Sequence, residues 1–204
     1  MKKTVWIAAL ALLVGVAVIF TVRSFVVESA SAQVPPKPSE RAAHTLQDKI
    51  NSIKQAEKDS GRSASETVEV SDAELESYVL YSLRAQIPAR VDSIDVKLTP
   101  GTVAADTKLT FGSSPTNNPM IDMLVSGTHT FTLRGKLAAT EGMGKFSLDQ
   151  ARVDGIPVPI VFIETLVDRY VKPKYPEVKL DEPFKMPWGI EGLTITNGKA
   201  TIVY

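Results

Sequence analysis

The side chains that commonly carry catalysis are scarce in this sequence. It contains no cysteine and two histidines, His44 and His129, so thiolate nucleophiles, Cys-ligated zinc and iron–sulfur clusters are excluded. Neither histidine has a partner at catalytic spacing, and there is no HExxH, G-x-S-x-G, P-loop or GxGxxG motif. We therefore predict no catalytic residue, no metal site and no cofactor. His129 is interpreted as a core-facing or edge histidine satisfied by a hydrogen bond.

Carboxylate pairs are the remaining route to acid–base chemistry. Asp92 lies three residues before Asp95, and Asp181 precedes Glu182 directly. A glycosidase needs two carboxyl groups that face each other across a substrate, whereas neighbouring carboxylates on loops and strand surfaces are usually solvated charges. We therefore expect a protein that is not an enzyme, and an enzyme of unknown mechanism is the distant alternative.

Composition and charge also limit the partners. The chain has 204 residues, of which 44% are hydrophobic and 23% are charged, values typical of one folded domain with an appendage. Its 23 basic and 23 acidic residues cancel. Because no basic surplus is available to neutralise a phosphate backbone, we expect no nucleic-acid partner.

The N-terminal segment predicts attachment to a membrane. Between Lys3 and Arg23 lie 19 uncharged residues, about the length that a helix needs to cross a bilayer. The two lysines before this run are expected to stay in the cytosol, which places the rest of the chain outside it, in the periplasm or at the cell surface. We favour an uncleaved single-pass anchor over residues 1–23. Cleavage of a signal peptide after Ala30-Ser31-Ala32 is the alternative.

Residues 24–66 are predicted to form a linker. Gln33–Ser39 contains three prolines, which favour an extended spacer. In the following segment the apolar residues step by 3, 4 and 3 positions and share one face of a helix: Ala43, Leu46, Ile50 and Ile53. Because this seam is too short for a sustained coiled coil, we expect a single amphipathic stalk helix, with pairing to a second copy of the chain as the alternative.

Residues 67–204 are predicted to form one folded domain of the α+β class. Ser71-Asp72-Ala73-Glu74 is a capping box, and helical spacing continues from it to Gln86. Alternating apolar and polar residues in the middle of the domain predict antiparallel strands. A second amphipathic helix is predicted after Gly155–Pro159, with an apolar stripe of Ile160, Ile163, Leu166, Val167 and Tyr170.

Two hairpins and one bulge can be predicted with their register. The hairpin loops are Pro100-Gly101 and Asn197-Gly198, of which the second is the stronger signal. A change of parity among the apolar residues of the strand that contains Phe146 predicts a bulge near Gln150. The predicted cross-strand pairs are Leu98 with Val103, Val96 with Ala105, Leu193 with Ile202, and Ile195 with Ala200.

Four short segments, spread across residues 67–204, carry a resemblance to a known family: Val70–Leu75, Ile94–Gly101, Gly155–Pro159 and Met186–Gly189. With the order of the elements, they resemble the LmeA-like, tubular lipid-binding (TULIP-like) group of envelope proteins. This resemblance implies a strongly curved antiparallel sheet packed on two amphipathic helices, with an apolar groove that holds the acyl chains of a membrane lipid or phospholipid. The polar stretch Gly112–Pro119 departs from the shorter connection expected there.

On this resemblance, apolar side chains of the strands and of the second helix become candidate lipid contacts, and close packing in a dry core is the alternative for each. Residues 119–124 and 186–188 could form a rim of the groove, because methionine adapts to varied apolar ligands and tryptophan favours the bilayer interface. A rim role requires partial exposure. The predicted lipid-binding residues are Phe131, Leu133, Phe146, Leu148, Ile163, Leu166, Tyr170, Met120, Met123 and Trp188.

The function predicted from the sequence is a membrane-anchored, extracytoplasmic and non-enzymatic domain that binds or handles lipid. The alternative is a structural or scaffolding protein of the cell envelope that acts through protein–protein contacts. Such a protein could bind a second copy or another envelope protein at the sheet edge or at the seam of the stalk helix.

Overall fold

The computed structural model describes residues 37–58, 65–87, 89–112, 126–168, 172–173 and 180–204. It confirms the α+β class: nine mostly antiparallel strands form one open sheet, and a few helices accompany it. The strands are β1 (Thr67–Ser71), β2 (Arg90–Thr99), β3 (Thr102–Phe111), β4 (Gly127–Thr140), β5 (Met143–Val153), β6 (Ile156–Pro157), β7 (Pro183–Lys185), β8 (Gly192–Thr196) and β9 (Lys199–Val203). The helical segments are α2 (Glu40–Lys58), α3 (Asp72–Ser77), the π-helical turn η1 (Tyr78–Ser82), the 3-10 turn η2 (Arg84–Gln86) and α5 (Ile160–Leu166).

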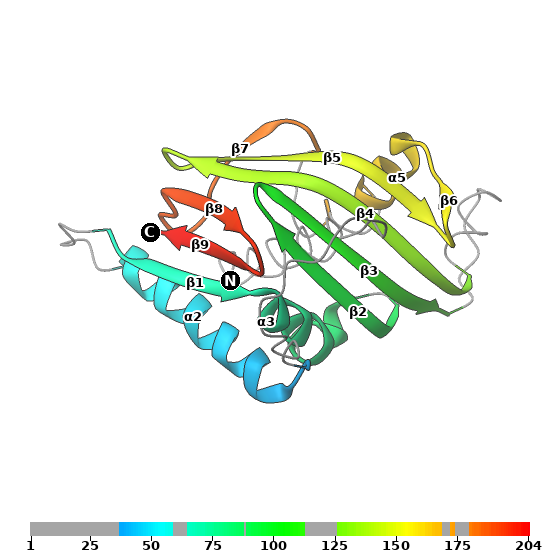
Figure 1. Ribbon diagram of the computed structural model, residues 1–204, viewed down its shortest axis with the longest axis horizontal. Coiled ribbons are helices and arrows are strands. Elements are labelled where there is room, and N and C mark those ends of the chain that lie inside the picture. Colours follow the sequence, from blue (N-terminus) through cyan, green and yellow to red (C-terminus); the bar gives the residue numbers. More distant parts are fainter. Residues whose placement is uncertain (1–36, 59–64, 88, 113–125, 169–171, 174–179) are drawn as a thin grey trace, which may run out of the picture.

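Two long strands, β4 and β5, form the spine of the sheet (Figure 1). The β2–β3 hairpin pairs with β4 over most of its length, and the β8–β9 hairpin joins β4 further along, at the pair Ala139–Leu193. The tips of the two hairpins meet: the Gly101 amide donates to the carbonyl of Ile195 at 3.1 Å, and the Gly198 amide donates to the carbonyl of Leu98 at 2.9 Å. A few turn contacts therefore join the hairpins end to end.

The predicted registers of both hairpins are confirmed. Leu98 pairs with Val103 and Val96 with Ala105, and in the C-terminal hairpin Leu193 pairs with Ile202 and Ile195 with Ala200. The second residue of each loop is a glycine with a positive φ, 66° at Gly101 and 74° at Gly198. Proline fits at the first loop position of the β2–β3 hairpin because the following glycine supplies the left-handed conformation.

A bulge interrupts the β4–β5 pairing, as the change of parity predicts. Arg134 pairs with Gln150 and the next residue, Gly135, pairs with Leu148, so Asp149 is the extra residue beside the predicted position. The Phe146 ring packs directly over Gly135, where a Cβ atom would lie 2.5 Å from two of its ring carbons. The glycine is needed here because the aromatic ring occupies the space of a side chain.

The first predicted helix is present, but it is not one regular α-helix. The Ser71 hydroxyl accepts from the Glu74 amide and the Glu74 carboxylate accepts from the Ser71 amide, which confirms the capping box. Only α3 is α-helical; the segment then widens into the π-helical turn η1 and tightens into η2. Periodicity alone does not distinguish these forms, because each keeps the apolar residues on the inner face.

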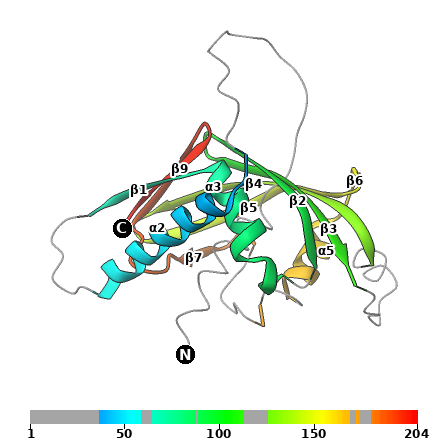
Figure 2. The same cartoon turned by 90° about the horizontal axis from the view of Figure 1, so that it is seen from below.

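Helix α2 belongs to the folded domain, and its assignment to a linker is wrong. Its predicted seam is correct, but these side chains are at most 7% exposed, because they pack against α3, η1 and the sheet: Ala43, Leu46, Ile50 and Ile53. In the described part of the chain, three α-helices therefore accompany the sheet instead of two, and α2, α3 and α5 lie on the same side of it (Figure 2). The sheet exposes more apolar surface than two short helices cover.

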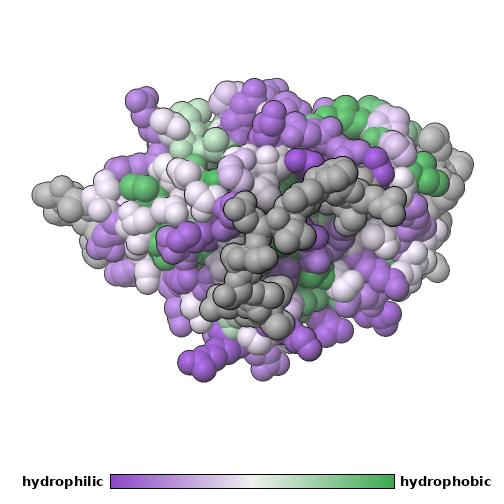
Figure 3. Space-filling model, viewed as in Figure 1, coloured by the Kyte–Doolittle hydropathy of each residue, from purple (hydrophilic) through white to green (hydrophobic). Residues whose placement is uncertain are grey.

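The second predicted helix, α5, departs from its predicted stripe at the start. Ile163 and Val167 are buried, but Ile160 is 41% exposed and its neighbour Val161 is 55% exposed. The first turn of α5 therefore presents two large apolar side chains to solvent. The space-filling view shows apolar atoms at this end of the molecule (Figure 3).

The predicted membrane anchor, residues 1–23, and the possible cleavage site lie outside the described residues, as does most of the proline-rich segment. Among the helices that the structure describes, none combines the length and the apolar character required for crossing a bilayer.

We predict that Gly135→Ala lowers the free energy of unfolding by about 1–3 kcal/mol, because the new methyl group overlaps the Phe146 ring and the Ser147 carbonyl. Urea unfolding of the full chain measures this loss. Gly112→Ala is the matched control, since a methyl group at that position would meet no other atom within 4 Å. Equal stability of the two variants would contradict the packing of Phe146 on Gly135.

Candidate functional site

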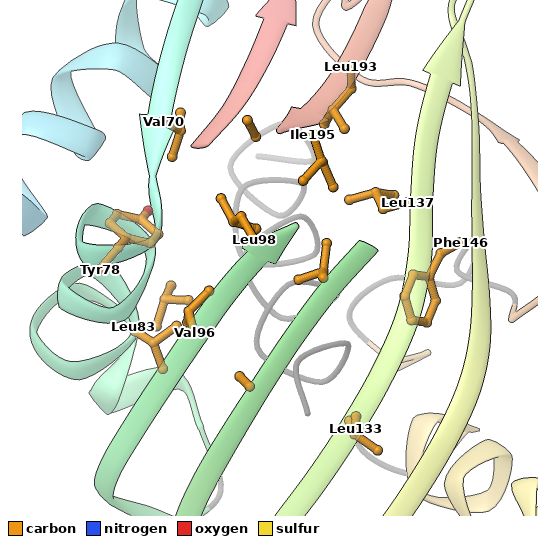
Figure 4. Close-up of a cluster of buried hydrophobic side chains, with 14 of the residues drawn as sticks. Val70, Tyr78, Leu83, Val96, Leu98, Leu133, Leu137, Phe146, Leu193 and Ile195 are labelled. Atoms are coloured by element: carbon orange, nitrogen blue, oxygen red, sulfur yellow. The ribbon is translucent and has the colours of Figure 1, made fainter. Parts of the chain in front are cut away.

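A cavity of about 60 Å³ lies between α2 and the sheet. Its floor is formed where the two hairpin tips meet, by residues such as Leu98 of β2 and Ile195 of β8, with Leu137 of β4 beside them (Figure 4). Its roof is the apolar seam of α2, and Tyr78 and Val79 of η1 form one side. The cavity surface is entirely apolar, because even Lys49 and Tyr78 contribute only carbon atoms. Such a surface suits hydrocarbon and does not hold ordered water.

The size of this cavity limits what it can hold in the present conformation. A volume of about 60 Å³ is less than half of the roughly 150 Å³ of an engineered apolar cavity that binds benzene. Part of an acyl chain fits, but a whole chain requires α2 to move outward from the sheet. The contacts that hold α2 therefore decide access to the cavity.

Polar contacts hold α2 at its edges. The Lys49 ammonium lies 2.6 Å from a Glu74 carboxylate oxygen and donates to the Glu69 carbonyl, also at 2.6 Å. The Tyr78 hydroxyl donates to the Gln47 side chain at 3.1 Å, and before the helix the Ser39 amide donates to the Ser77 hydroxyl. These contacts lie around the apolar seam and not within it, so they fix the position of α2 without making the cavity polar.

The π-helical turn η1 supplies one wall of the cavity. Its inner residues Tyr78 and Val79 are each 3% exposed, whereas Tyr81 is 49% exposed on the outer side. At its end the Leu83 amide donates to the Tyr78 carbonyl at 3.0 Å, which is the wide spacing of a π-turn. π-helical turns occur mostly as single turns inside α-helices and are frequent at functional sites.

Among the predicted site residues that the structure describes, Trp188 alone lines the cavity. It has a φ of 57° and is followed by Gly189 with a φ of 69°, in a turn closed by a hydrogen bond from the Ile190 amide to the Pro187 carbonyl. A left-handed conformation is strained for a bulky residue. Trp188 is only 7% exposed. A rim residue must be partly exposed, so the prediction that Trp188 lies at the rim is wrong. It faces the cavity from inside because the turn directs it beneath α2.

The other predicted lipid contacts do not line this cavity. Phe131, Leu133, Phe146 and Ile163 are buried in the packed core, and Leu148 is half-buried against it. Leu166 lies in α5, but its side chain is outside the described part of the structure, as are Tyr170, Met120 and Met123. The structure therefore places the cavity nearer to the C-terminal hairpin than the predicted residues do.

The sequence predicts the strands that form the floor of the cavity, but it does not predict that α2 forms the roof. The apolar face shared by the predicted hairpins contains Leu98, Val103 and Ile195, all of which line the cavity. The seam of α2 is recognisable as a helical pattern, but its role depends on long-range packing. The sequence gives one local signal for this role. The seam of four apolar residues on α2 is too short to form a coiled coil, so it must pack against another surface.

The His129 imidazole, which was considered for catalysis, has structural partners. Both ring nitrogens of His129 face acceptors: Nδ1 lies 2.7 Å from Asp154 Oδ2, and Nε2 lies 2.8 Å from the Ser126 carbonyl. The His129 hydrogen bond, and then that of the Thr130 amide, hold the pKa of Asp154 below its usual value. The hydrogen bond predicted for His129 is confirmed. Within the described residues, no group of His, Cys, Asp and Glu could hold a metal ion.

Glu76 is the described carboxyl group with the clearest departure from ordinary behaviour. It is partly buried between α3 and the edge strand β2, where it accepts a hydrogen bond from the Val96 amide at 2.7 Å. Burial raises the pKa of Glu76 to about 7, although the Val96 hydrogen bond opposes the shift. Asp95 and Asp72 raise this pKa further, and Lys97 lowers it. Glu76 thus attaches α3 to the sheet edge while it resists ionisation.

Comparison of the chain with protein-family models, curated proteins and solved structures finds no match. The resemblance to the tubular lipid-binding group therefore stays a prediction.

We predict that the contribution of Glu76 to the free energy of unfolding falls as the pH rises from about 4.5 to about 7. In this range the folded state retains the Glu76 proton that the unfolded state has lost, so a higher pH favours unfolding. Glu76→Gln keeps an acceptor for the Val96 amide and removes the buried charge. We expect it to gain about 1 kcal/mol at pH 8, a value reduced for solvent screening of a partly exposed group.

Urea unfolding at pH 5 and pH 8 measures this effect. Glu164→Gln, at an exposed position of α5, controls for the loss of one negative charge. A Glu76→Gln gain that is the same at both pH values would contradict the assignment.

Proposed function

We propose that this protein is a membrane-anchored, extracytoplasmic domain that binds or handles lipid and is not an enzyme. The supporting observation is the wholly apolar cavity between α2 and the sheet, which has no polar surface to position a reacting group. A ligand that enters it gains by burial of hydrocarbon, at roughly 25 cal/mol per Å². The anchor predicted from residues 1–23 keeps such a domain beside its source of lipid.

The arrangement also supports the resemblance to the tubular lipid-binding group. In that group, as the sequence resemblance implies, a strongly curved antiparallel sheet packs on amphipathic helices and leaves an apolar groove for acyl chains. Here the sheet is open and its helices lie on one side of it. The groove corresponds to the cavity under α2, and α2 takes the position of a cover over it.

We predict that lipid binding depends on the volume of this cavity. A photoreactive fatty acid with a diazirine on its chain, added to the full chain in nanodiscs, should label peptides from α2 and β9. Ala200→Leu fills the cavity from β9 and should reduce this labelling several-fold while stability is maintained or raised, because filling a cavity removes a packing defect.

Ala138→Leu is the matched control, since Ala138 lies at an exposed position of β4. It should leave the labelling unchanged. Absence of label from cavity peptides in the unsubstituted protein would overturn the proposed function. Equal loss in both variants would assign the label to the surface.

A specific observation also favours the second function, that of a scaffolding protein. The exposed large apolar side chains Ile156, Ile160 and Val161 cluster at β6 and the start of α5, with exposures of 68%, 41% and 55%. A contiguous apolar patch of this kind is typical of a contact surface. The seam of α2, in contrast, is buried in its own domain and is not available for pairing in this conformation.

We predict that, if scaffolding is the function, a photo-crosslinking residue at position 156 of the full chain captures a second copy in the membrane. The product would have twice the mass of the chain on a denaturing gel. Crosslinks to lipid alone, or none to protein, would contradict the scaffolding role. The same residue at position 138 is the control for random collision.

A further inference from the structure

Lys54 of α2 lies beside Trp188, a residue that lines the cavity. Its ammonium nitrogen is 5.4 Å from the centre of the Trp188 ring, within the range of a cation–π contact. Among the described residues, no carboxylate forms an ion pair with it. Lys49, five residues earlier on α2, differs because it already pairs with Glu74 at 2.6 Å. Lys49 and Lys54 therefore have different capacities for a new anion.

Trp188 connects Lys54 to the cavity. The indole lines the cavity under α2 and also contacts the Lys54 ammonium. Its left-handed backbone conformation, with a φ of 57°, fixes the ring in this position at a cost in backbone strain. The same indole therefore takes part in the cavity lining and in the contact with the Lys54 ammonium group.

The surroundings of Lys54 favour an added negative charge. Burial lowers the pKa of Lys54, and the positive charge of Lys58 lowers it further. Both effects disfavour the ammonium form, and an anion beside the nitrogen would offset both. A neutral headgroup would offset neither.

We propose that the ligand is an anionic single-chain amphiphile, whose hydrocarbon chain occupies the cavity under α2 and whose acidic headgroup pairs with Lys54 beside Trp188. This inference rests on the proposed lipid-binding function and adds the class of ligand. The recognised chemistry is an acidic group at the end of one chain, which a fatty acid and a single-chain phosphate share. A fatty alcohol or a methyl ester of the same length lacks it.

The test compares two diazirine probes of equal chain length, a fatty acid and the corresponding fatty alcohol, on the full chain in phosphatidylcholine nanodiscs. The readout is the labelling of cavity peptides. Lys54→Gln should reduce labelling by the acid about tenfold, because one charge-assisted hydrogen bond is lost. It should leave labelling by the alcohol unchanged. Lys54→Arg keeps the positive charge and should restore labelling by the acid. An alkyl phosphate that competes as well as the fatty acid would show that the acidic group, and not the carboxylate itself, is recognised.

Two further variants keep the result interpretable. Lys54→Met replaces the charged side chain by an unbranched apolar one and should behave as Lys54→Gln does. Lys97→Gln removes a lysine of β2 whose side chain is 59% exposed. It should change labelling by neither probe.

The outcomes separate the two proposals. If both probes label the protein equally and Lys54→Gln changes neither, the anionic class is overturned while lipid binding stands. A loss of acid labelling in Lys97→Gln as large as in Lys54→Gln also overturns it, because general surface charge would then be responsible. If neither probe labels the cavity, the proposed function itself fails.

Discussion

Coverage of the apolar side of a single open sheet is the constraint on which the rest of this structure depends. A sheet with one apolar face needs a second layer, because exposed hydrocarbon destabilises the folded state in proportion to its area. The segment α3–η1–η2 covers the β2 side, and α5 contacts β5 at the other end. The C-terminal hairpin and the ends of β2 and β3 would remain exposed without α2. Burial of the α2 seam is therefore part of the fold and not an accessory to it.

The cavity follows from how the two hairpins join. Continuous strands present a regular row of side chains, but here Leu98 and Ile195 lie beside two hairpin tips that are joined by turn hydrogen bonds. A smooth helix such as α2 does not fill the irregular surface over this junction. The result is a packing defect at the point where three parts of the chain meet.

The sequence predicts local structure well and long-range coverage poorly. The capping box at Ser71, the register of both hairpins and the bulge beside Gln150 depend on neighbouring residues, and the structure contains all three. The role of α2 depends on a surface formed by strands far along the chain, so its short seam indicates a helix but not a partner. For the same reason Trp188 can be singled out as a residue of interest, while its buried position cannot be derived.

Several features that do not favour stability coincide at one place. A cavity, a π-helical turn, a tryptophan in a left-handed conformation and a lysine without a carboxylate partner among the described residues all lie beneath or beside α2. Two of them have a simpler alternative: a larger side chain than Ala200 would fill the cavity, and a regular α-helical turn at Tyr78 would replace the π-helical turn. Sequences that specify a fold depart from such choices mainly where function requires it. Their coincidence is the physical basis of our proposal that the function lies under α2.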